Sequence, residues 1–537
     1  MRSISRVFWM CAGSLALGLA GCALDDASLE SAGGGGFAGN DQRPDAGANG
    51  GGAGAVVPPP EQEAESSFRS PVATSRFIWT ANPESGRVAL IDAVSLEVRT
   101  FQAGFGPTWL AALPSREDPD SNAAIVLNVL GHDATVLRVL PDGAVTTERA
   151  PVHADANSWA IGASGRVALA WTDAAKVEHA DPTEGFQDVT VLGLGANGVS
   201  STRLSVGYRP TRVTISADER RAFLVTEPGV SVLDLSKSPP AVLDDVIVTD
   251  DPVDDPASRD VSITPDGAYA LVRLDGSPEV GVVELVSGSR VAVTLSAPVT
   301  DLDLSEDGSF ALAVARATSE VALLPVPAIF SDPASFESLT LPNQTIGSAA
   351  LAASGALALL YTNAVASDHL TSLDLRPGDT FLQHRTVGLR AQVSAVFPTP
   401  DAAHALALLT PGAGSTRAGA FSVVPLTANL PPKLQGTDAP FFAVALSPAP
   451  TTRAVVATRD DAQRIYEAYL ARMPELRIDR VPLASAPLAV GMVPAANKAF
   501  IAQEYAEGRI TFIDLSTGAP YTLTGFELAA KVVDGAR

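Results

Sequence analysis

The stretch that decides the fold is RDVSITPDGAYALVRLDGSPEVGVVEL, residues 259–285. Val261 and Ile263 alternate with polar neighbours, which is the period-2 pattern of a half-buried strand. Asp266-Gly267 follows and supplies the backbone freedom that a tight hairpin turn needs. Two more apolar runs come next, so this stretch predicts three short antiparallel strands, with a looser fourth strand after them.

The same pattern returns about every 47 residues from about Ser75 onward. The clear copies run over residues 209–235, 299–324 and 488–518, and the weaker copies begin near Pro107, Asn157, Gly347, Ala391 and Pro440. A period of this length, with four short strands in each unit, predicts the blades of an all-β propeller. No unit can bury both of its faces alone, so neighbouring units must stack against each other.

The number of blades is predicted less sharply than their form. We count ten units, and eight or nine blades or two smaller rings are the alternatives, although no linker divides the repeats. The first unit, Arg76–Ala103, has no preceding strand of its own, and no strand follows the last apolar stretch, Leu528–Val533. Pairing of these two ends within one blade would leave no open sheet edge, so we expect the ring to close there.

These copies resemble the YVTN-type repeat, which is similar to the WD40 repeat. The matching segments are Thr264–Gly267, Phe223–Thr226, Val230–Asp234, Ile513–Gly518, and Phe77–Asn82 with Val88–Asp92. Ser354-Gly355 and Pro448-Ala449 depart from the pattern because they lack the Asp-Gly turn. The resemblance implies the architecture alone. Propellers of this type resemble lactonases and quinone-dependent dehydrogenases in overall architecture, but no residue here matches the functional residues of those enzymes one by one.

One segment carries the opposite periodicity. Apolar residues fall at helical spacing between Asp461 and Pro474, at Ala462, Ile465, Tyr466, Tyr469, Leu470 and Met473. The repeat register instead places Arg464–Leu470 on the third strand of its blade. We favour the strand because closure of the ring requires it.

The N-terminus has the features of an export signal. Arg2 and Arg6 precede the apolar run Val7–Ala20, which is too short to span a bilayer. Leu19-Ala20-Gly21-Cys22 resembles the lipobox of bacterial lipoproteins. The resemblance implies cleavage before Cys22, a diacylglyceryl group on its sulfur and acylation of the new amine. Ala23 is not the Asp that resembles an inner-membrane retention signal, which implies the outer membrane, facing either the periplasm or the cell surface.

Residues 22–70 are predicted to be a disordered tether. Gly33–Gly36, Gly50–Gly52 and Pro58–Pro60 lie among small and polar residues, with too few apolar side chains to offset the entropy of ordering. The expected division of the chain is therefore a signal peptide over 1–21, a lipidated linker over 22–70 and a propeller over 71–537.

Charge and cysteine content exclude several classes of function. The formal net charge is −23, so we expect no nucleic acid partner, because binding nucleic acid needs a basic face. Charge alone would not hold the chain on an anionic membrane either. Cys11 and Cys22 are the two cysteines, so the mature domain has no thiol for a disulfide, a metal or a thiolate nucleophile.

A dinucleotide motif and two acidic runs are candidate sites. Gly193–Gly198 fits G-x-G-x-x-G, but a strand-like segment follows where the motif needs a helix, so we interpret it as a turn. Carboxylates are the ligands that Ca²⁺ prefers, and the acidic runs are Glu117–Asn122 and Asp250, Asp251, Asp254, Asp255 and Asp260. The first run lacks the central Gly and closing Glu of a calcium loop and prolines interrupt the second, so we interpret both as solvated loops.

The remaining candidate side chains are histidines and tryptophans. The histidines are His132, His153, His179, His369, His384 and His404, and no two are spaced like paired metal ligands. Trp79, Trp109, Trp159 and Trp171 fall in or beside strands, where we expect core packing. No G-x-S-x-G elbow is present. We therefore expect no catalytic residue, cofactor or metal site, although distant residues can still meet across a channel.

Three functions fit these observations. The first is a membrane-anchored module that binds a protein or glycan through its loops, because loops on a rigid scaffold carry most binding sites. The second is an enzyme, which would bring His, Arg and acidic residues together at one mouth of the channel. The third is a passive component of the cell envelope, which would have no stable partner.

Overall fold

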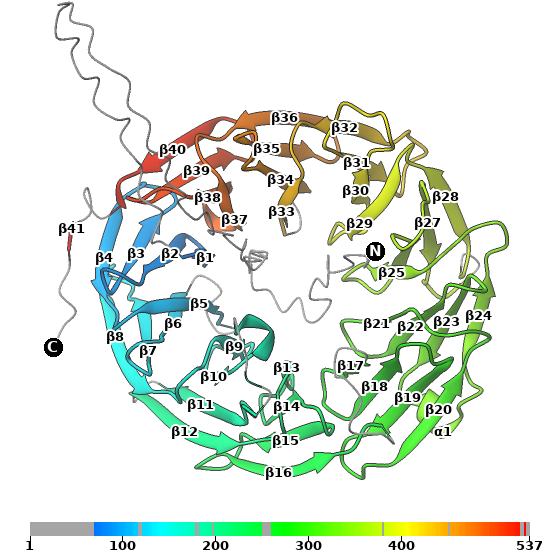
Figure 1. Cartoon of the computed structure of the whole chain (residues 1–537), viewed down its shortest axis with the longest axis horizontal. Helices are drawn as coiled ribbons and strands as arrows, with labels where there is room; N and C mark the ends of the chain where they lie inside the picture. Colours follow the sequence, from blue (N-terminus) through cyan, green and yellow to red (C-terminus); the bar gives the residue numbers. More distant parts are fainter. Residues whose placement is uncertain are drawn as a thin grey trace, which may run out of the picture.

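The computed structural model describes residues 69–532, apart from 116–120, 178–180, 182, 196–197, 250–258, 379–380, 449–451 and 527–530. Cys22 and most of the linker lie outside these residues. The described residues form ten antiparallel sheets in one ring, each made of four consecutive strands. Figure 1 shows the sheets arranged like blades around a central channel. The count of ten units is therefore confirmed, in a single ring.

The first five blades occupy residues 72–294. Blade 1 contains β1 (Val72–Ala73), β2 (Phe77–Asn82), β3 (Arg87–Asp92) and β4 (Val98–Gln102). Blade 2 contains β5 (Pro107–Leu113), β6 (Asn122–Asn128), β7 (Asp133–Val139) and β8 (Val145–Pro151). Blade 3 contains β9 (Ser158–Ile161), β10 (Val167–Trp171), β11 (Asp188–Gly195) and β12 (Gly198–Ser205). Blade 4 contains β13 (Arg212–Ile215), β14 (Arg221–Val225), β15 (Val230–Asp234) and β16 (Ala241–Val246). Blade 5 contains β17 (Arg259–Ile263), β18 (Tyr269–Leu274), β19 (Glu279–Glu284) and β20 (Arg290–Thr294).

The other five blades occupy residues 301–524. Blade 6 contains β21 (Asp301–Leu304), β22 (Phe310–Ala315), β23 (Glu320–Pro325) and β24 (Glu337–Thr340). Blade 7 contains β25 (Ser348–Leu351), β26 (Leu357–Tyr361), β27 (His369–Asp374) and β28 (His384–Gly388). Blade 8 contains β29 (Gln392–Pro398), β30 (His404–Thr410), β31 (Gly419–Pro425) and β32 (Lys433–Thr437). Blade 9 contains β33 (Phe441–Leu446), β34 (Arg453–Asp460), β35 (Ile465–Arg472) and β36 (Arg477–Pro482). Blade 10 contains β37 (Pro487–Val493), β38 (Lys498–Gln503), β39 (Arg509–Asp514) and β40 (Pro520–Thr524).

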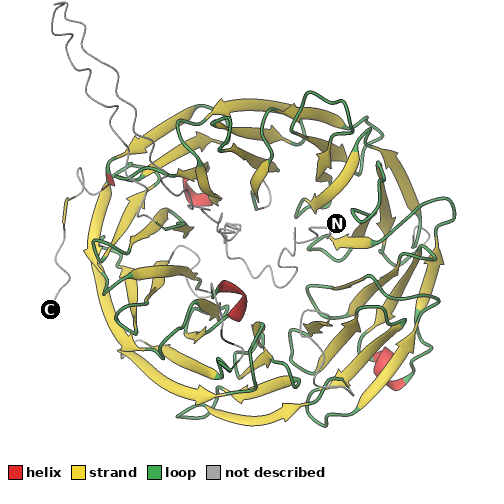
Figure 2. Cartoon of the chain, viewed as in Figure 1, coloured by secondary structure: helices red, strands yellow, loops and turns green. Residues whose placement is uncertain are grey.

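Helices contribute little to the fold, as Figure 2 shows. The helices of the described residues include α1 (Ala328–Ser331) and the 3₁₀ turns η1 (Ala174–Lys176) and η3 (Pro494–Ala496). No helix in the described part of the chain combines the length and apolar character that crossing a bilayer requires.

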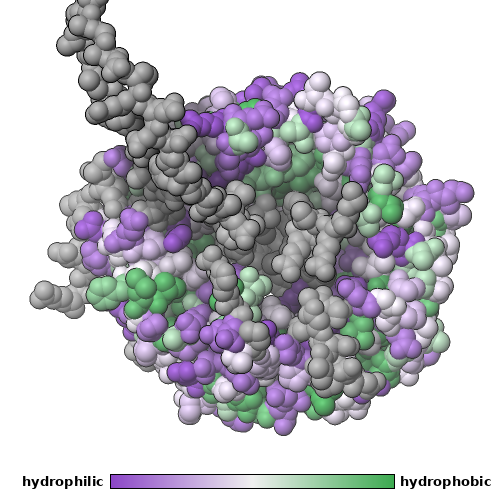
Figure 3. Space-filling view, in the orientation of Figure 1, coloured by the Kyte–Doolittle hydropathy of each residue, from purple (hydrophilic) through white to green (hydrophobic). Residues whose placement is uncertain are grey.

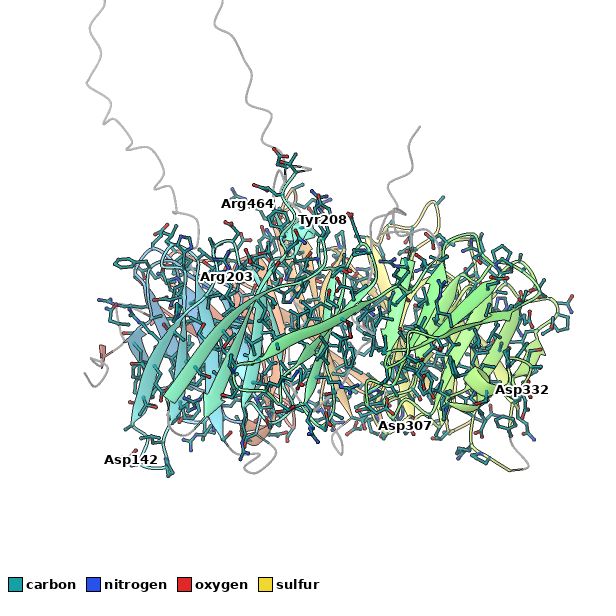
Figure 4. The ribbon with its side chains drawn as sticks, turned by 90° about the horizontal axis from the view of Figure 1, so that it is seen from below. Asp142, Arg203, Tyr208, Asp307, Asp332 and Arg464 are labelled. Carbon is teal, nitrogen blue, oxygen red and sulfur yellow. The ribbon has the colours of Figure 1, made fainter. Side chains whose placement is uncertain are left out.

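The ring has two faces, which Figure 4 shows edge-on. We call upper the face that carries the turns between second and third strands and the connections between blades, with Tyr208 and Arg464 as examples. The lower face carries the other two hairpin turns of each blade, with Asp142 and Asp307 as examples. Figures 1 to 3 view the upper face.

The two chain ends meet in blade 1, but not in the way that the sequence predicted. The first unit has a preceding strand after all, because β1 pairs with β2 through Val72 opposite Trp79. The inner edge of β2 is therefore occupied by β1. The C-terminal strand β41 (Lys531–Val532) pairs instead with β4, in parallel, on the outer edge of the same sheet. The ring itself closes by packing, since Ile78 of blade 1 shares a core cluster with Phe500 and Phe512 of blade 10.

The turn motif of the repeat is a side-chain clamp on the hairpin between the first two strands. In blade 5, Thr264 Oγ1 donates to Asp266 Oδ1 at 2.6 Å and accepts from Tyr269 N at 3.0 Å. In blade 6, Ser305 Oγ donates to Asp307 Oδ1 at 2.8 Å in the same way. Asp and Ser/Thr are favoured in turns because their side chains bond nearby backbone groups. The Asp of the repeat is thus used by the turn on the lower face.

The units without Asp-Gly keep the same turn where the structure describes it. Gly355 has a φ of +66°, close to the +68° of Gly267 and the +73° of Gly308. Its N–H donates to Ala352 O at 2.8 Å, as Gly308 N donates to Ser305 O. The left-handed residue therefore defines this turn more strictly than the acid does. Ala449, in the other divergent unit, lies outside the described residues.

The segment with helical spacing is a strand, as the repeat register predicted. β35 pairs with β34 on one side and β36 on the other, with Tyr469 opposite Val456. Ala468 and Leu470 pack into the core between blades 9 and 10, while Tyr469 and Ala471 pack into the core between blades 8 and 9. A strand buried on both faces is apolar at successive positions, which removes the period-2 signal.

Two turn glycines allow the cost of a left-handed backbone to be measured apart from the cost of a steric clash. Gly308 and Gly288 have φ values of +73° and +71°, but a Cβ on Gly308 would lie 2.6 Å from Pro265 Cδ, whereas one on Gly288 would meet nothing within 4 Å. We expect Gly288→Ala to cost about 1 kcal/mol of unfolding free energy. Gly308→Ala should cost roughly 1–3 kcal/mol more, because Pro265 must also shift. Equal urea-unfolding midpoints for the two variants would show that the turns of neighbouring blades are not closely packed.

Candidate functional site

The wall of the central channel consists of the first strand of each blade, whose inner edge pairs with no other strand among the described residues. Such an edge leaves backbone N–H and C=O groups that need partners. Side chains from neighbouring blades supply several of them. Trp159 Nε1 of blade 3 donates to Trp109 O of blade 2 at 3.0 Å, and Arg212 Nη1 of blade 4 donates to Val261 O of blade 5 at 3.1 Å.

Two carboxylates make this contact between blades 6 and 7. Asp301 Oδ2 accepts from Ala349 N at 2.7 Å, and Asp303 Oδ2 accepts from Leu351 N at 3.0 Å. The two acids are two residues apart on β21, so their side chains leave the strand on the same face. They fasten the inner strand of one blade to the inner strand of the next.

The pKa values of these two acids are higher than is usual for aspartic acid. Burial raises the pKa of Asp301 to about 7 and that of Asp303 to about 6, although the backbone N–H donors act in the opposite direction. Burial also raises the pKa of Asp260, while Arg212 and Arg273 lower it. Carboxyl groups that titrate near neutrality can take up or release a proton at working pH, which makes this wall a candidate acid–base site.

Arginines approach the same wall, and a buried tyrosine adds to it. Arg212 Nη1 lies 3.8 Å from Asp260 Oδ1, and Arg273 Nη1 lies 2.6 Å from Asp275 Oδ1. Burial, together with the charges of the two β21 acids, raises the pKa of Tyr361 to about 12. No described histidine is among the groups that shift these acids. The enzyme hypothesis requires His, Arg and acidic residues, and the described residues of this wall supply the arginines and the acids.

The acidic runs of the sequence do not form a metal site in the described part of the chain, where no three His, Cys, Asp or Glu side chains are arranged to hold an ion. Asp260 is buried in β17, away from solvent, whereas residues 250–258 lie outside the described residues. Asn122 begins β6, where its Oδ1 accepts from Thr74 Oγ1 at 2.7 Å, and residues 116–120 also lie outside.

The glycine motif is a hairpin, as we interpreted it. Gly195 ends β11 and faces Gly198, which begins β12. A strand thus occupies the place where a dinucleotide site would need the N-terminus of a helix.

The tryptophans pack as expected, with two of them near the channel. Trp79 is fully buried and its Nε1 donates to Thr74 Oγ1 at 3.1 Å, and Trp171 is also buried. Trp109 and Trp159 are half-buried and pack against the core between blades 2 and 3.

The histidines occupy separate positions. His132 and His153 line one small hollow on the upper face, between the β6–β7 turn and the connection from blade 2 to blade 3. His369 begins β27, His384 begins β28 and His404 begins β30, while His179 lies outside the described residues.

Sequence reasoning missed a pair of exposed apolar side chains on the upper face. Phe105, between blades 1 and 2, is 77% exposed, and Leu130, in the β6–β7 turn, is 75% exposed. They are neighbours, since Phe105 O accepts from Leu130 N and from Gly131 N, each at 3.1 Å. Figure 3 shows apolar surface at the left of the upper face, where Figure 1 places blades 1 and 2. The available signal was a large apolar residue within a glycine-rich turn, at Gly104-Phe105-Gly106 and Leu130-Gly131.

Comparison with known proteins gives only distant structural likenesses. No family model matches the chain, and no curated protein matches it. A eukaryotic initiation factor is similar over 78% of this chain and 95% of its own, at 13% identity and a TM-score of 0.49. Dihydro-heme d1 dehydrogenase NirN in complex with DHE is similar over 78% and 81%, at 14% and 0.42. The β-propeller domain of Myceliophteria thermophila Cps50 (Swd1) is similar over 59% and 95%, at 13% and 0.33. These likenesses extend to no particular function.

The channel acids give a second prediction. A carboxyl group whose pKa is raised by folding favours the folded state below its unfolded pKa, and this contribution is lost as pH rises through its folded pKa. We therefore expect Asp301→Asn, which keeps an acceptor for Ala349 N but never ionises, to be more stable than the parent at pH 8 and equal to it near pH 3. The gain should be up to about 2 kcal/mol in urea unfolding, because the site is partly exposed.

The matched control variant should change the free energy of unfolding in the opposite direction. Hydrogen bonds from Ser309 and Ser305 lower the pKa of Asp307. Asp307→Asn should therefore lose stability at pH 8 and approach the parent at low pH. Parallel pH profiles for the two variants would contradict the assignment of proton uptake to Asp301.

Proposed function

We propose that this chain is a bacterial cell-envelope lipoprotein, anchored by lipid on Cys22 in the outer membrane, whose propeller binds another protein through its upper face. The observation that carries the binding role is the pair Phe105 and Leu130, exposed next to each other on two connections of that face. Clustered exposed apolar side chains mark sites of interaction, whereas single ones are common on any surface.

The anchor and the scaffold support the same function. The Leu19–Cys22 motif supports lipidation, and two or three acyl chains would make membrane attachment lasting. The linker 22–70 would hold the ring away from the bilayer, with its loops free to meet a partner. Ten blades also give a broad, rigid surface, which limits the entropy lost on binding.

Catalysis at the channel wall is the second candidate, because Asp301 and Asp303 titrate near neutrality beside Asp260 and two arginines. The geometry favours binding over catalysis. Both β21 carboxylates already accept backbone N–H groups of blade 7, so their position serves the joint between blades.

A crosslinking experiment in intact cells tests the proposal. We expect affinity purification after crosslinking to recover one dominant protein partner. Cys22→Ala should release the chain from the membrane fraction and lose that partner. A Phe105→Ala, Leu130→Ala double variant should stay in the membrane fraction and still lose it, because only the contact surface has changed. Recovery of a glycan, or of nothing above background, would overturn protein binding and favour a glycan ligand or the passive role.

A further inference from the structure

A cavity opens on the lower face, between blades 1 and 2. Its volume is about 230 Å³, which leaves room for roughly eight water molecules at about 30 Å³ each. A space of this size suits a small organic molecule better than a single ion. Figure 4 marks the lower face by Asp142, the neighbour of Gly143 in the β7–β8 turn. The lining residues are Arg76, Phe77, Asp92, Glu97, Arg99 and Gly143.

Strand register explains why these side chains gather at one place. Phe77 of β2 lies opposite Asp92 of β3, and Asp92 N donates to Glu97 O at 3.0 Å, so the three residues form one row across the sheet. Arg99 lies opposite Leu90, in the next row, and its side chain leaves β4 on the same side as that of Glu97. Phe77 and Leu90 share a core cluster with residues of blade 2. This face of blade 1 is therefore turned toward blade 2, and its lower end lines the cavity.

One of the two arginines is neutralised within the cavity wall. Arg76 donates through Nε to Asp92 Oδ1 at 3.0 Å and through Nη2 to Asp92 Oδ2 at 2.5 Å. Asp92 Oδ1 also accepts from Val94 N at 2.8 Å and from Ser95 N at 3.2 Å. The β3–β4 turn thus holds this ion pair in place, and its two charges cancel. The charge that a ligand would meet must come from the other lining residues.

The second arginine and a glutamate keep their charges. Arg99 Nη1 donates to Gly143 O of blade 2 at 2.6 Å, which positions the guanidinium without neutralising it. Among the described residues, Arg99 has no ion pair with a carboxylate, and the exposed Glu97 has none with a cation. Positions two residues apart along an extended chain are separated by about 7 Å. The two opposite charges therefore line the same cavity without pairing with each other.

We propose that this cavity binds a zwitterionic small molecule of the free amino acid type, with its carboxylate on Arg99 and its ammonium on Glu97. A guanidinium presents a planar set of N–H donors that suits a carboxylate, and a carboxylate accepts from an ammonium. A molecule that carries both groups on one carbon can lie between the two side chains. A purely anionic or purely cationic ligand would leave one of the two protein charges without a partner.

The other lining residues and the location complete the proposal. Phe77 offers an apolar contact for the side chain of the ligand. The cavity lies on the face opposite to Phe105 and Leu130, so this site goes beyond the proposed function and does not depend on it.

Isothermal titration calorimetry with the whole mature chain at low salt tests the site. The probes are L-leucine, L-leucinamide, which lacks the carboxylate, and N-acetyl-L-leucine, which lacks the ammonium. We expect L-leucine to bind with a Kd of about 1 mM or tighter, as a small ligand held by two charge-assisted contacts should. Each analogue should bind at least about tenfold more weakly, because each leaves one protein charge without its partner.

Two variants assign each charge to its residue. Glu97→Gln should weaken L-leucine about fivefold and leave N-acetyl-L-leucine unchanged, since that probe has no ammonium. Arg99→Gln should weaken L-leucine about fivefold and leave L-leucinamide unchanged, since that probe has no carboxylate. Arg99→Gln also removes the hydrogen bond to Gly143 O, whereas Glu97→Gln removes no side-chain bond among the described residues. Glu97→Gln therefore tests the site even if Arg99→Gln folds poorly.

Glu306→Gln and Arg376→Gln are the matched controls, because both residues lie in lower-face turns of other blades. Both should leave L-leucine binding unchanged. No binding heat at roughly 10 mM L-leucine, equal binding of the three probes, or no effect of Glu97→Gln would overturn the proposal. Glu97→Gln should still recover the crosslinked partner of the upper face, so the failure of either proposal leaves the other intact.

Discussion

The structure depends on one packing constraint, which is that every blade is apolar on both faces. In β14, Ala222 and Leu224 belong to the core between blades 3 and 4, whereas Phe223 and Val225 belong to the core between blades 4 and 5. A blade at an open end would expose such a face to water, at a cost of roughly 25 cal/mol for each Å² of apolar surface. The ring therefore closes, and Phe500 and Phe512 of blade 10 cover Ile78 of blade 1.

A second constraint arises at the channel, where the inner strand of each blade has an edge that pairs with no other strand in the described part of the chain. Side chains of neighbouring blades form hydrogen bonds with backbone groups of these inner strands, and the side-chain type decides whether the contact depends on pH. Trp159 and Arg212 act as donors without changing their charge, whereas the half-buried carboxylates of Asp301 and Asp303 act as acceptors. The joint between blades 6 and 7 is thereby coupled to protonation near neutral pH.

The repeat divides its chemistry between the two faces. On the lower face, acids such as Asp266, Asp307 and Asp514 accept hydrogen bonds within their own turns, so much of the acidity there serves local structure. On the upper face the turns differ from blade to blade. The Phe105 and Leu130 pair and the small hollow lined by His132 and His153 are features of such upper-face connections.

The sequence by itself determined what depends on neighbours along the chain. Strand alternation and turn chemistry are local, so the repeats at 259–285 and 299–324, the hairpin at Gly193–Gly198 and the count of ten units could all be predicted. The tertiary structure alone decided what depends on stacking. β1 is too short for a pattern to show it, and β41 pairs with a strand more than 400 residues away. Asp301 meets Ala349, and His132 lines the same hollow as His153, only because consecutive blades stack against each other.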